Sequence, residues 1–447
     1  MQQNEPIINV GILSAPKIEF ILNGAFITPQ GNIFSGKQIV SWENEKIIFG
    51  GNTFEVLEFT AEEPDASFDL MDVVIGIGFH WERKENQRFK GALKIIVEND
   101  KLTAINRIAV EDYLISVISS EMSATASDEL LKAHAVISRS WLLHPLQKQR
   151  AKDKEQRPQN EFKTFDAQFS ALHYTKWYER DAHTNFDVCA DDHCQRYQGI
   201  TKASTEAVVK AIEATRGQVL MYDGKICDTR FSKSCGGISE TFENCWAPEP
   251  HPYLTKVIDN PNAPEGFDTD LTIEANAEKW IRESPEAFCN TTDKKILAQV
   301  LNNYDQETTD FYRWKVEYTQ AEISELLQRR SGIDFGQIID LIPVKRGESG
   351  RLIELKIIGT KQTVVVGKEL EIRKWLSNSH LYSSAFVVDK YEIINSIPQH
   401  FTLTGAGWGH GVGLCQIGAA VMGEKGYKYD EILLHYFKGA ELKKIYL

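Results

Sequence analysis

The stretch VEDYLISVISSEM, residues 110–122, decides the fold assignment, because its apolar residues recur at the spacing of an α-helix. Val110, Leu114, Val117 and Ile118 share one helical face. Glu121 continues that face, three residues beyond Ile118 and four beyond Val117. We therefore predict a helix whose buried side ends in a carboxylate.

A second helix is expected directly after the first. Ser127 is a suitable N-cap, and Asp128 and Glu129 suit the first helical turn. The pattern continues through LLKAHAVISRSWLL, and we expect the helix to end near Pro145.

Short β-rich runs precede these helices, at residues 7–13, 18–22, 72–75 and 93–97. Downstream, the pattern predicts a helix at 203–217, a hairpin turn at Asp223-Gly224, mostly helices over 272–340, and strands over 341–395 with a turn at Gly347–Gly350. From Phe401 we expect a strand, a glycine loop and a helix. The predicted fold class is α+β. The predicted domains are a β-rich N-terminal domain (1–100) and a larger region (101–447). This larger region carries a charged insertion at 146–180 and a helical and strand insertion at 260–400.

The composition is that of a globular protein of 447 residues, with 42% hydrophobic and 25% charged residues. A net charge of -13 argues against electrostatic binding to nucleic acid or to an anionic membrane, so we expect no nucleic-acid partner. An uncharged or weakly charged polymer such as a glycan remains compatible with it.

The first residues, MQQNEPIINVGILSAP, lack the basic and apolar regions of a signal peptide, and no run reaches the length of a transmembrane segment. We expect a cell-envelope or periplasmic location if an export signal has been removed, and a cytoplasmic one if Met1 is the native start.

Glu121 is the candidate catalytic group. A carboxyl group that finishes an apolar helical face points toward the core or a cleft, where desolvation favours the protonated form that a general acid needs. The alternative is a glutamate at the rim of the helix that hydrogen-bonds a neighbouring backbone group.

His183, Cys189, His193 and Cys194 offer four metal ligands within twelve residues. Their number and kind suit a closed tetrahedral zinc site, and four protein ligands would make that zinc structural. The seven cysteines of the chain, an odd number, fit metal binding better than a disulfide framework. The alternatives are free cysteines with surface histidines, or a Cys189–Cys194 disulfide.

The stretch GAGWGHGVGLCQIGA, residues 405–419, has glycine at every second position from 405 to 413. Such alternation permits backbone conformations closed to other residues and a close approach of ligand to main chain. It contains no dinucleotide-binding fingerprint. Trp408 and His410, with Gln416 behind them, suit stacking on a sugar and recognition of hydroxyl groups. The alternative is a tight structural loop.

Ser234-Cys235-Gly236-Gly237 follows a predicted strand. Cys235 with His410 would make a thiol-peptidase candidate. A buried cysteine at a strand-to-turn junction is the favoured alternative, because no local signature supports a nucleophile.

Together these segments resemble the SpoIID/LytB family, the stage II sporulation protein D and amidase enhancer family. The resemblance rests on residues 110–140, on SKSCGG and APEPHPYL, on GWGHGVGLCQIGA, and on YDEILLHYFKGAEL. It covers roughly residues 100–447. It implies a SpoIID-like core and, for the sporulation branch, a lytic transglycosylase that cuts glycan strands lacking stem peptides.

The resemblance also implies roles for individual residues. Glu121 matches the family's catalytic glutamate, and Arg139 would pair with the lactyl carboxylate of the muramic sugar. Ser234, Tyr253 and Tyr436 join Trp408, His410 and Gln416 as expected substrate-binding residues. The four His and Cys residues at 183–194 resemble the zinc ligands of some clostridial members.

Two segments depart from the family pattern: Ser119-Ser120 stand where Pro-Ala is common, and Cys415 stands where Ser is common. Three hypotheses follow. The chain is a lytic transglycosylase with one acid/base, a non-catalytic wall-binding modulator of a cell-wall amidase, or a thiol hydrolase that uses Cys235. The expected partners are peptidoglycan glycan strands and, for the modulator, that amidase.

Overall fold

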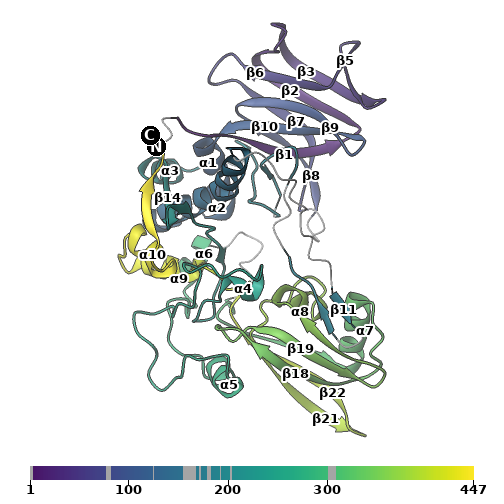
Figure 1. Cartoon of the computed structure of the whole chain (residues 1–447), viewed down its shortest axis with the longest axis vertical. Coiled ribbons are helices and arrows are strands. Elements are labelled where there is room, and N and C mark those ends of the chain that lie inside the picture. Colours follow the sequence, from purple (N-terminus) through teal and green to yellow (C-terminus); the bar gives the residue numbers. More distant parts are fainter. Residues whose placement is uncertain are drawn as a thin grey trace.

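A large β-sheet forms the N-terminal part of the protein (Figure 1). The computed structural model describes residues 4–76, 82–123, 125–154, 168–170, 173–178, 183–191, 193–201, 204–300 and 309–447. The sheet has the order β13-β1-β10-β9-β6-β2-β3-β4-β5, and β7 joins β8 to β2. Its strands are β1 (Ile7–Ala15), β2 (Lys17–Ile27), β3 (Ile33–Glu43), β4 (Lys46–Phe49), β5 (Asn52–Phe54), β6 (Val56–Ala61), β7 (Ser67–Ile75), β8 (Arg83–Phe89), β9 (Ala92–Glu98), β10 (Lys101–Ala109) and β13 (Val188–Cys189).

Alternating burial explains why these residues form strands. Along β2, the side chains of Ile18, Phe20 and Leu22 are buried, whereas the residues between them are partly exposed. This period of two gives the sheet one apolar face. Phe59 lies on that face, and its ring centre is 5.3 Å from that of Phe20. The four runs predicted as strands before residue 100 all lie within strands of this sheet.

A helical layer follows directly from β10 (Figure 1). Helix α1 (Val110–Glu121) packs against α2 (Asp128–Lys154) and α3 (Glu206–Ala214). The C-terminal helices α9 (Gln416–Glu424) and α10 (Tyr429–Tyr436) also pack on α2. A small sheet of β14 (Gln218–Tyr222), β15 (Lys225–Ile226) and β24 (Glu441–Lys444) completes the layer, with the predicted turn at Asp223-Gly224.

The prediction that the second helix ends near Pro145 is wrong. α2 continues through Pro145 to Lys154, although proline removes one helical hydrogen bond. Contacts with β15 on both sides of the proline account for this. His144 Nδ1 lies 2.7 Å from the carbonyl oxygen of Ile226, and the Ile226 N–H donates to Gln147 Oε1 at 2.8 Å.

A second lobe has its own hydrophobic core and lies apart from the N-terminal sheet (Figure 1). Trp375 is its largest fully buried side chain. One sheet has the order β11-β12-β20-β19-β18 and the other the order β17-β22-β21. The elements are β11 (Gln168–Ser170), β12 (His173–Thr175), β17 (Arg313–Thr319), α7 (Gln320–Ser331), β18 (Ile338–Arg346), β19 (Leu352–Gly359), β20 (Thr363–Gly367), α8 (Glu369–Trp375), β21 (Phe386–Ile394) and β22 (Ile397–Ala406).

Short elements connect the two parts. They are β16 (Phe231–Ser232), α4 (Phe242–Cys245), α5 (Glu274–Glu283), α6 (Lys294–Val300) and β23 (Leu414–Cys415). The α+β class is confirmed. The β-rich layer extends to Ala109, beyond the predicted boundary, and takes β13 from later in the chain. Strand β17 interrupts the region predicted as mostly helical, and α8 lies within the region predicted as strands. Much of the charged insertion, including 155–167, lies outside the described residues. Among the residues described, no helix is long and apolar enough to span a bilayer.

A buried ion pair joins the first turn of α1 to the middle of α2. Arg139 on α2 is fully buried, and its Nε and Nη2 donate to the two carboxylate oxygens of Glu111 at 3.0 and 2.6 Å. Glu111 also accepts the Gly217 N–H at 3.1 Å and the Tyr446 hydroxyl at 2.6 Å. Burial raises the pKa of Glu111, but the charge of Arg139 and these hydrogen bonds outweigh it and lower that pKa below 4.5.

Removing the Glu111 charge should destabilise the fold. Glu111→Gln leaves Arg139 buried without a counter-charge, which costs about 3–5 kcal/mol of unfolding free energy. Chemical denaturation at neutral pH measures this loss.

The same variant should change the pH dependence of stability. Because the folded-state pKa of Glu111 is depressed, its contribution is present above the unfolded pKa and is lost as pH falls through the folded value. The parent should therefore lose stability below about pH 4.5 more steeply than Glu111→Gln. Glu19→Gln, at an exposed ion pair with Lys37, is the control and should behave like the parent. Equal stability of the parent and Glu111→Gln would contradict the role of this pair.

Candidate functional site

Glu121 is the last residue of α1, and its side chain is partly buried. Leu114, Val117 and Ile118, which precede it on the same face, are 0% exposed. The predicted apolar face is therefore confirmed. Glu121 lies at the C-terminal end of α1, where the negative end of the helix dipole favours an uncharged carboxyl group.

Hydrogen bonds connect the end of α1 with the start of α9. The N–H of Ser123 donates to the carbonyl of Gln299 on α6 at 3.0 Å. The next residue on α6, Val300, accepts the ammonium of Lys233 at 2.6 Å. The Lys233 carbonyl in turn accepts the N–H of Ile417 in α9 at 3.1 Å. The structure thus brings the residues around Glu121 into one network with those around Gln416.

Gln416 begins α9 and is buried. Its Nε2 lies 3.4 Å from Nε2 of His134, a fully buried residue of α2. Burial and the charge of Lys233 lower the pKa of His134 to about 3, so this imidazole is neutral at physiological pH. Sequence reasoning missed His134 and Lys233, because no local pattern marks a single histidine in an apolar helix or a single lysine after a short strand.

The glycine loop closes around a buried arginine. Gly407, Gly409, Gly411 and Gly413 all have positive φ, between 74° and 94°, as the alternating pattern predicted. A Cβ at Gly411 would lie 2.4 Å from Nη1 of Arg351, and the Arg351 Nε donates to the carbonyl of Gly409 at 3.0 Å. Gly407 and Gly411 therefore make room for the Arg351 guanidinium, and Gly413 makes room for the carbonyl of Arg230, which supports the structural-loop alternative.

Trp408 and His410 are partly exposed side chains of this loop. The Trp408 ring centre lies 4.3 Å from that of Tyr382 and 4.6 Å from that of Phe311. The Nδ1 of His410 accepts the Val412 N–H at 3.0 Å, so a neutral ring carries its proton on Nε2. Burial and nearby arginines lower the pKa of His410 well below its usual value, which keeps the ring neutral. Binding of sugar by this pair stays a prediction.

Five residues expected to contact substrate are buried, namely Arg139, Ser234, Tyr253, Gln416 and Tyr436, and the structure corrects those assignments. Arg139 is committed to Glu111, and its Nη1 donates to the Gln218 carbonyl at 2.9 Å, so no substrate carboxylate can reach it. Ser234 is 0% exposed, within the backbone pairing with Trp408.

The two tyrosines are buried for a different reason. The Tyr253 hydroxyl accepts the N–H of Asp228 at 2.9 Å, and the Tyr436 hydroxyl donates to Asp259 Oδ1 at 2.6 Å. Both rings are at most 6% exposed. Each phenol thus satisfies a buried polar group instead of lining a cleft.

The thiol-hydrolase hypothesis is also wrong. Cys235 is buried, and burial raises the pKa of its thiol well above the usual value. Its sulfur lies 3.7 Å from that of Cys289, and no interaction with the His410 ring is found among the described residues. A nucleophile needs the thiolate, a base and access to substrate, and this cysteine has none of them.

His183, Cys189, His193 and Cys194 come together as predicted. All four ligand atoms lie within 4.8 Å of one another. His183 Nε2 and His193 Nδ1 each lie 3.4 Å from the sulfur of Cys194, and His193 Nδ1 lies 3.8 Å from that of Cys189. β13 positions Cys189 by pairing with β1, where Cys189 is opposite Gly11. Neither cysteine forms a disulfide. The set could therefore hold a tetrahedral metal ion.

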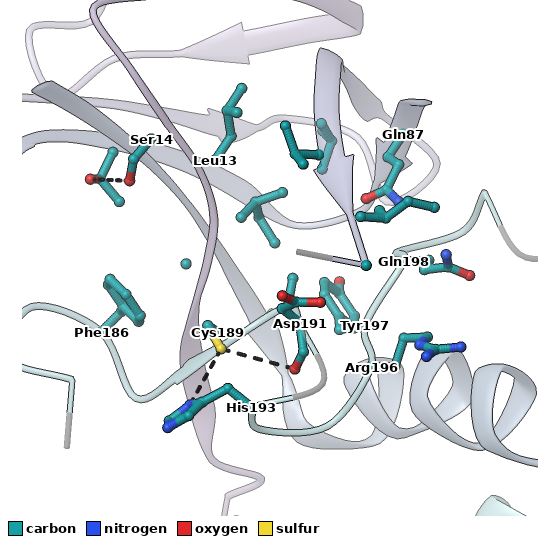
Figure 2. Close-up of a pocket in the computed structure, with 18 of the residues that line it drawn as sticks. Leu13, Ser14, Gln87, Phe186, Cys189, Asp191, His193, Arg196, Tyr197 and Gln198 are labelled. Carbon is teal, nitrogen blue, oxygen red and sulfur yellow. Dashed lines mark hydrogen bonds between the residues drawn. The ribbon is translucent and has the colours of Figure 1, made fainter. Parts of the chain in front are cut away.

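We call these four residues the Cys2His2 cluster. Three of them, His183, Cys189 and His193, line a cavity of about 470 Å³. Figure 2 shows residues that line this cavity. The Cys189 sulfur faces the His193 ring, Leu13 from β1 lies above them in this view, and Arg196, Tyr197 and Gln198 lie to one side. Glu121, Trp408 and His410 are not among its lining residues. The cavity is therefore separate from the Glu121 region.

Two family models match different parts of the chain. Residues 98–222 match the family model described as stage II sporulation protein (SpoIID), and residues 240–413 match a domain of unknown function (DUF8618). An uncharacterized protein of Brachyspira hyodysenteriae is 26% identical over 79% of this chain and 72% of its own length. The stage II sporulation protein D of Bacillus amyloliquefaciens is 23% identical over 76% of each chain. The amidase enhancer of Bacillus subtilis is 27% identical over 52% of this chain and 32% of its own length.

The packing of the glycine loop on Arg351 can be tested with two matched substitutions. Gly411→Ala places a methyl group against the guanidinium at a φ of +77°. Gly426→Ala has a φ of +89° but meets no atom within 4 Å, so it measures the backbone strain alone, about 1–2 kcal/mol. Gly411→Ala should lower the melting temperature clearly more than Gly426→Ala. Equal losses would show that Arg351 does not fill the loop.

Proposed function

Because the chain belongs to the SpoIID/LytB family, we propose that it is a lytic transglycosylase acting on cell-wall glycan, with Glu121 as its single acid/base. The substrate would be peptidoglycan strands of alternating MurNAc and GlcNAc, without stem peptides. The observation that carries this proposal is the position of Glu121. It ends the buried face of α1, inside the matched region 98–222, and beside the network that leads to α9.

One carboxyl group is enough for this reaction. Hydrolytic glycosidases need a pair of carboxylates because a water molecule must be activated or a covalent intermediate formed. In a lytic transglycosylase the C6 hydroxyl of the muramic sugar is the nucleophile. Protonated Glu121 donates its proton to the leaving glycosidic oxygen as that bond breaks. The Glu121 carboxylate then takes the proton of the C6 hydroxyl as the new bond to C1 forms, which leaves a 1,6-anhydro end and restores the acid.

The site offers support for the acid form of Glu121 and for binding an uncharged polymer. The C-terminal end of α1 disfavours a negative charge at that position. Partly exposed Trp408 offers an aromatic face of the kind on which sugars stack, whereas the His410 ring is hydrogen-bonded to the backbone of Val412 and Phe231. Activity on envelope glycan also implies an envelope location, which fractionation of the native protein would test.

Glu121→Gln should abolish turnover and leave folding intact. Glutamine keeps the size of the side chain but cannot transfer the proton, and acid/base groups contribute roughly 10²–10⁴-fold to rate. Peptide-free glycan strands are incubated with each variant, and anhydro-ended fragments are counted by mass spectrometry. Glu206→Gln, at an exposed ion pair on α3, is the matched control and should retain parental activity.

Two outcomes would contradict this proposal in different ways. Parental turnover by Glu121→Gln would show that the acid is another residue. No product from the parent on any glycan, together with binding to sacculi, would favour the alternative of a wall-binding modulator of an amidase. The likeness to the amidase enhancer of Bacillus subtilis is the observation behind that alternative.

We also propose a structural zinc ion at the Cys2His2 cluster. Purified protein should contain zinc there, and Cys194→Ser should lose that zinc together with thermal stability, because a closed site contributes its binding energy to folding. Cys227→Ser is the control, since Cys227 is buried outside the cluster and its loss should leave zinc unchanged. A Cys189–Cys194 disulfide in metal-free protein would refute the zinc site.

A further inference from the structure

A second group of metal-binding side chains lies in the core, away from the Cys2His2 cluster. The sulfurs of Cys235, Cys289 and Cys415 and a carboxylate oxygen of Asp259 all lie within 4.8 Å of one another. Each of the four residues is at most 2% exposed. We call them the Cys3Asp cluster.

The distances suit one tetrahedral ion. Zinc–sulfur bonds of about 2.3 Å at tetrahedral angles place two sulfurs about 3.8 Å apart. The sulfurs of Cys235 and Cys289 are 3.7 Å apart, and all three cysteines are free of disulfides. Three soft sulfur ligands and one carboxylate are a donor set that selects zinc over magnesium or calcium.

The hydrogen bonds around the cluster are those that a metal–thiolate site uses. The Cys235 N–H donates to the sulfur of Cys415 at 3.2 Å, and the Gly237 N–H donates to the sulfur of Cys235 at 3.4 Å. Asp259 is held by two donors, the Tyr436 hydroxyl at 2.6 Å and the Cys289 N–H at 2.8 Å. Such outer contacts orient ligands and stabilise their charge.

Gly418 leaves room for the Asp259 carboxylate and the Tyr436 hydroxyl. A Cβ at Gly418 in α9 would lie 2.3 Å from the Tyr436 hydroxyl oxygen and 2.4 Å from Asp259 Oδ1. Any side chain at this position would displace the carboxylate or the phenol that orients it. The absence of a side chain thus keeps Asp259 beside the three sulfurs.

Two arginines supply the opposite charge. Arg351 donates to the carbonyl of Cys235 at 3.0 Å, and Arg313 donates to that of Gly236 at 3.3 Å. Neither arginine forms an ion pair with a carboxylate among the residues that the structure describes. Three thiolates and one carboxylate around a divalent ion carry a net charge of about −2, which two guanidinium groups balance.

We propose that Cys235, Asp259, Cys289 and Cys415 bind a second, buried zinc ion with a structural role. Its four ligands leave no open position for substrate. Cys415 ends β23 directly before Gln416, and Cys235 follows β16, which pairs with β23. Cys289 lies between α5 and α6. The ion therefore joins the start of α9 to the segments beside β16 and α6. These segments carry the hydrogen bonds that connect the end of α1 with α9. The proposal does not depend on glycan cleavage.

Metal analysis of the full chain tests the proposal. The parent, prepared and reconstituted without oxygen, should contain about two zinc ions per chain. A variant with His183→Ala and Cys194→Ser lacks the Cys2His2 cluster and should keep about one zinc. X-ray absorption of that variant should show three sulfurs at about 2.3 Å and one oxygen at about 2.0–2.2 Å.

Single substitutions separate the two sites. Cys289→Ser should lose one zinc from the parent, whereas the buried control Cys227→Ser should lose none. If Cys289→Ser does not fold, the absorption spectrum of the variant without the Cys2His2 cluster still decides the question. The proposal is overturned if that variant folds, binds no zinc after reconstitution, and shows free thiols or a Cys235–Cys289 disulfide by mass spectrometry.

Discussion

The buried ion pair between Glu111 and Arg139 is the constraint on which the helical layer depends. It joins the first turn of α1 to the middle of α2, and through Gly217 and Tyr446 it also joins the start of β14 and the end of the chain. Two charges removed from water in this way are stable only with full hydrogen bonding, so these segments cannot shift independently. Glu121 lies ten residues beyond Glu111 along α1, about 15 Å away. The ion pair at the first turn of α1 therefore fixes the helix and, with it, the position of Glu121 at the last residue.

Elements with a strong local period could be predicted from the sequence, and elements fixed by tertiary contacts could not. The apolar face of α1 and the alternation in β2 appear directly in the residue pattern. The continuation of α2 beyond Pro145 depends on β15, which lies about 80 residues later. Strand β17 is different, because its sequence RWKVEYT alternates apolar and polar residues and its burial follows that period of two. The prediction of mostly helices over 272–340 overlooked this local signal, whereas no local pattern in α2 points to β15.

The same distinction applies to the candidate sites. The Cys2His2 cluster spans only twelve residues, so its four ligands could be grouped from spacing alone. The Cys3Asp cluster draws on residues 235 to 415, and only the folded chain brings them together. Matching the motifs assigned roles to Arg139, Tyr253 and Tyr436 from their place in the chain. It carried no information on whether their side chains are exposed, and the structure shows that all three are buried in the core. The prediction of Glu121 is more informative because its helical face also defines where the side chain points.

The glycine loop shows how the buried framework and the surface site are connected. Two of its positive-φ glycines, Gly407 and Gly411, leave room for Arg351, and Arg351 donates to the carbonyl of Cys235. Two partly exposed side chains lie between these glycines. Trp408 and His410 are those side chains, and each is restrained by ring packing or by a backbone hydrogen bond. A substitution in this loop thus changes the framework and the candidate binding surface together, so an effect on glycan cleavage there has to be compared with the effect on stability before a role in binding is assigned.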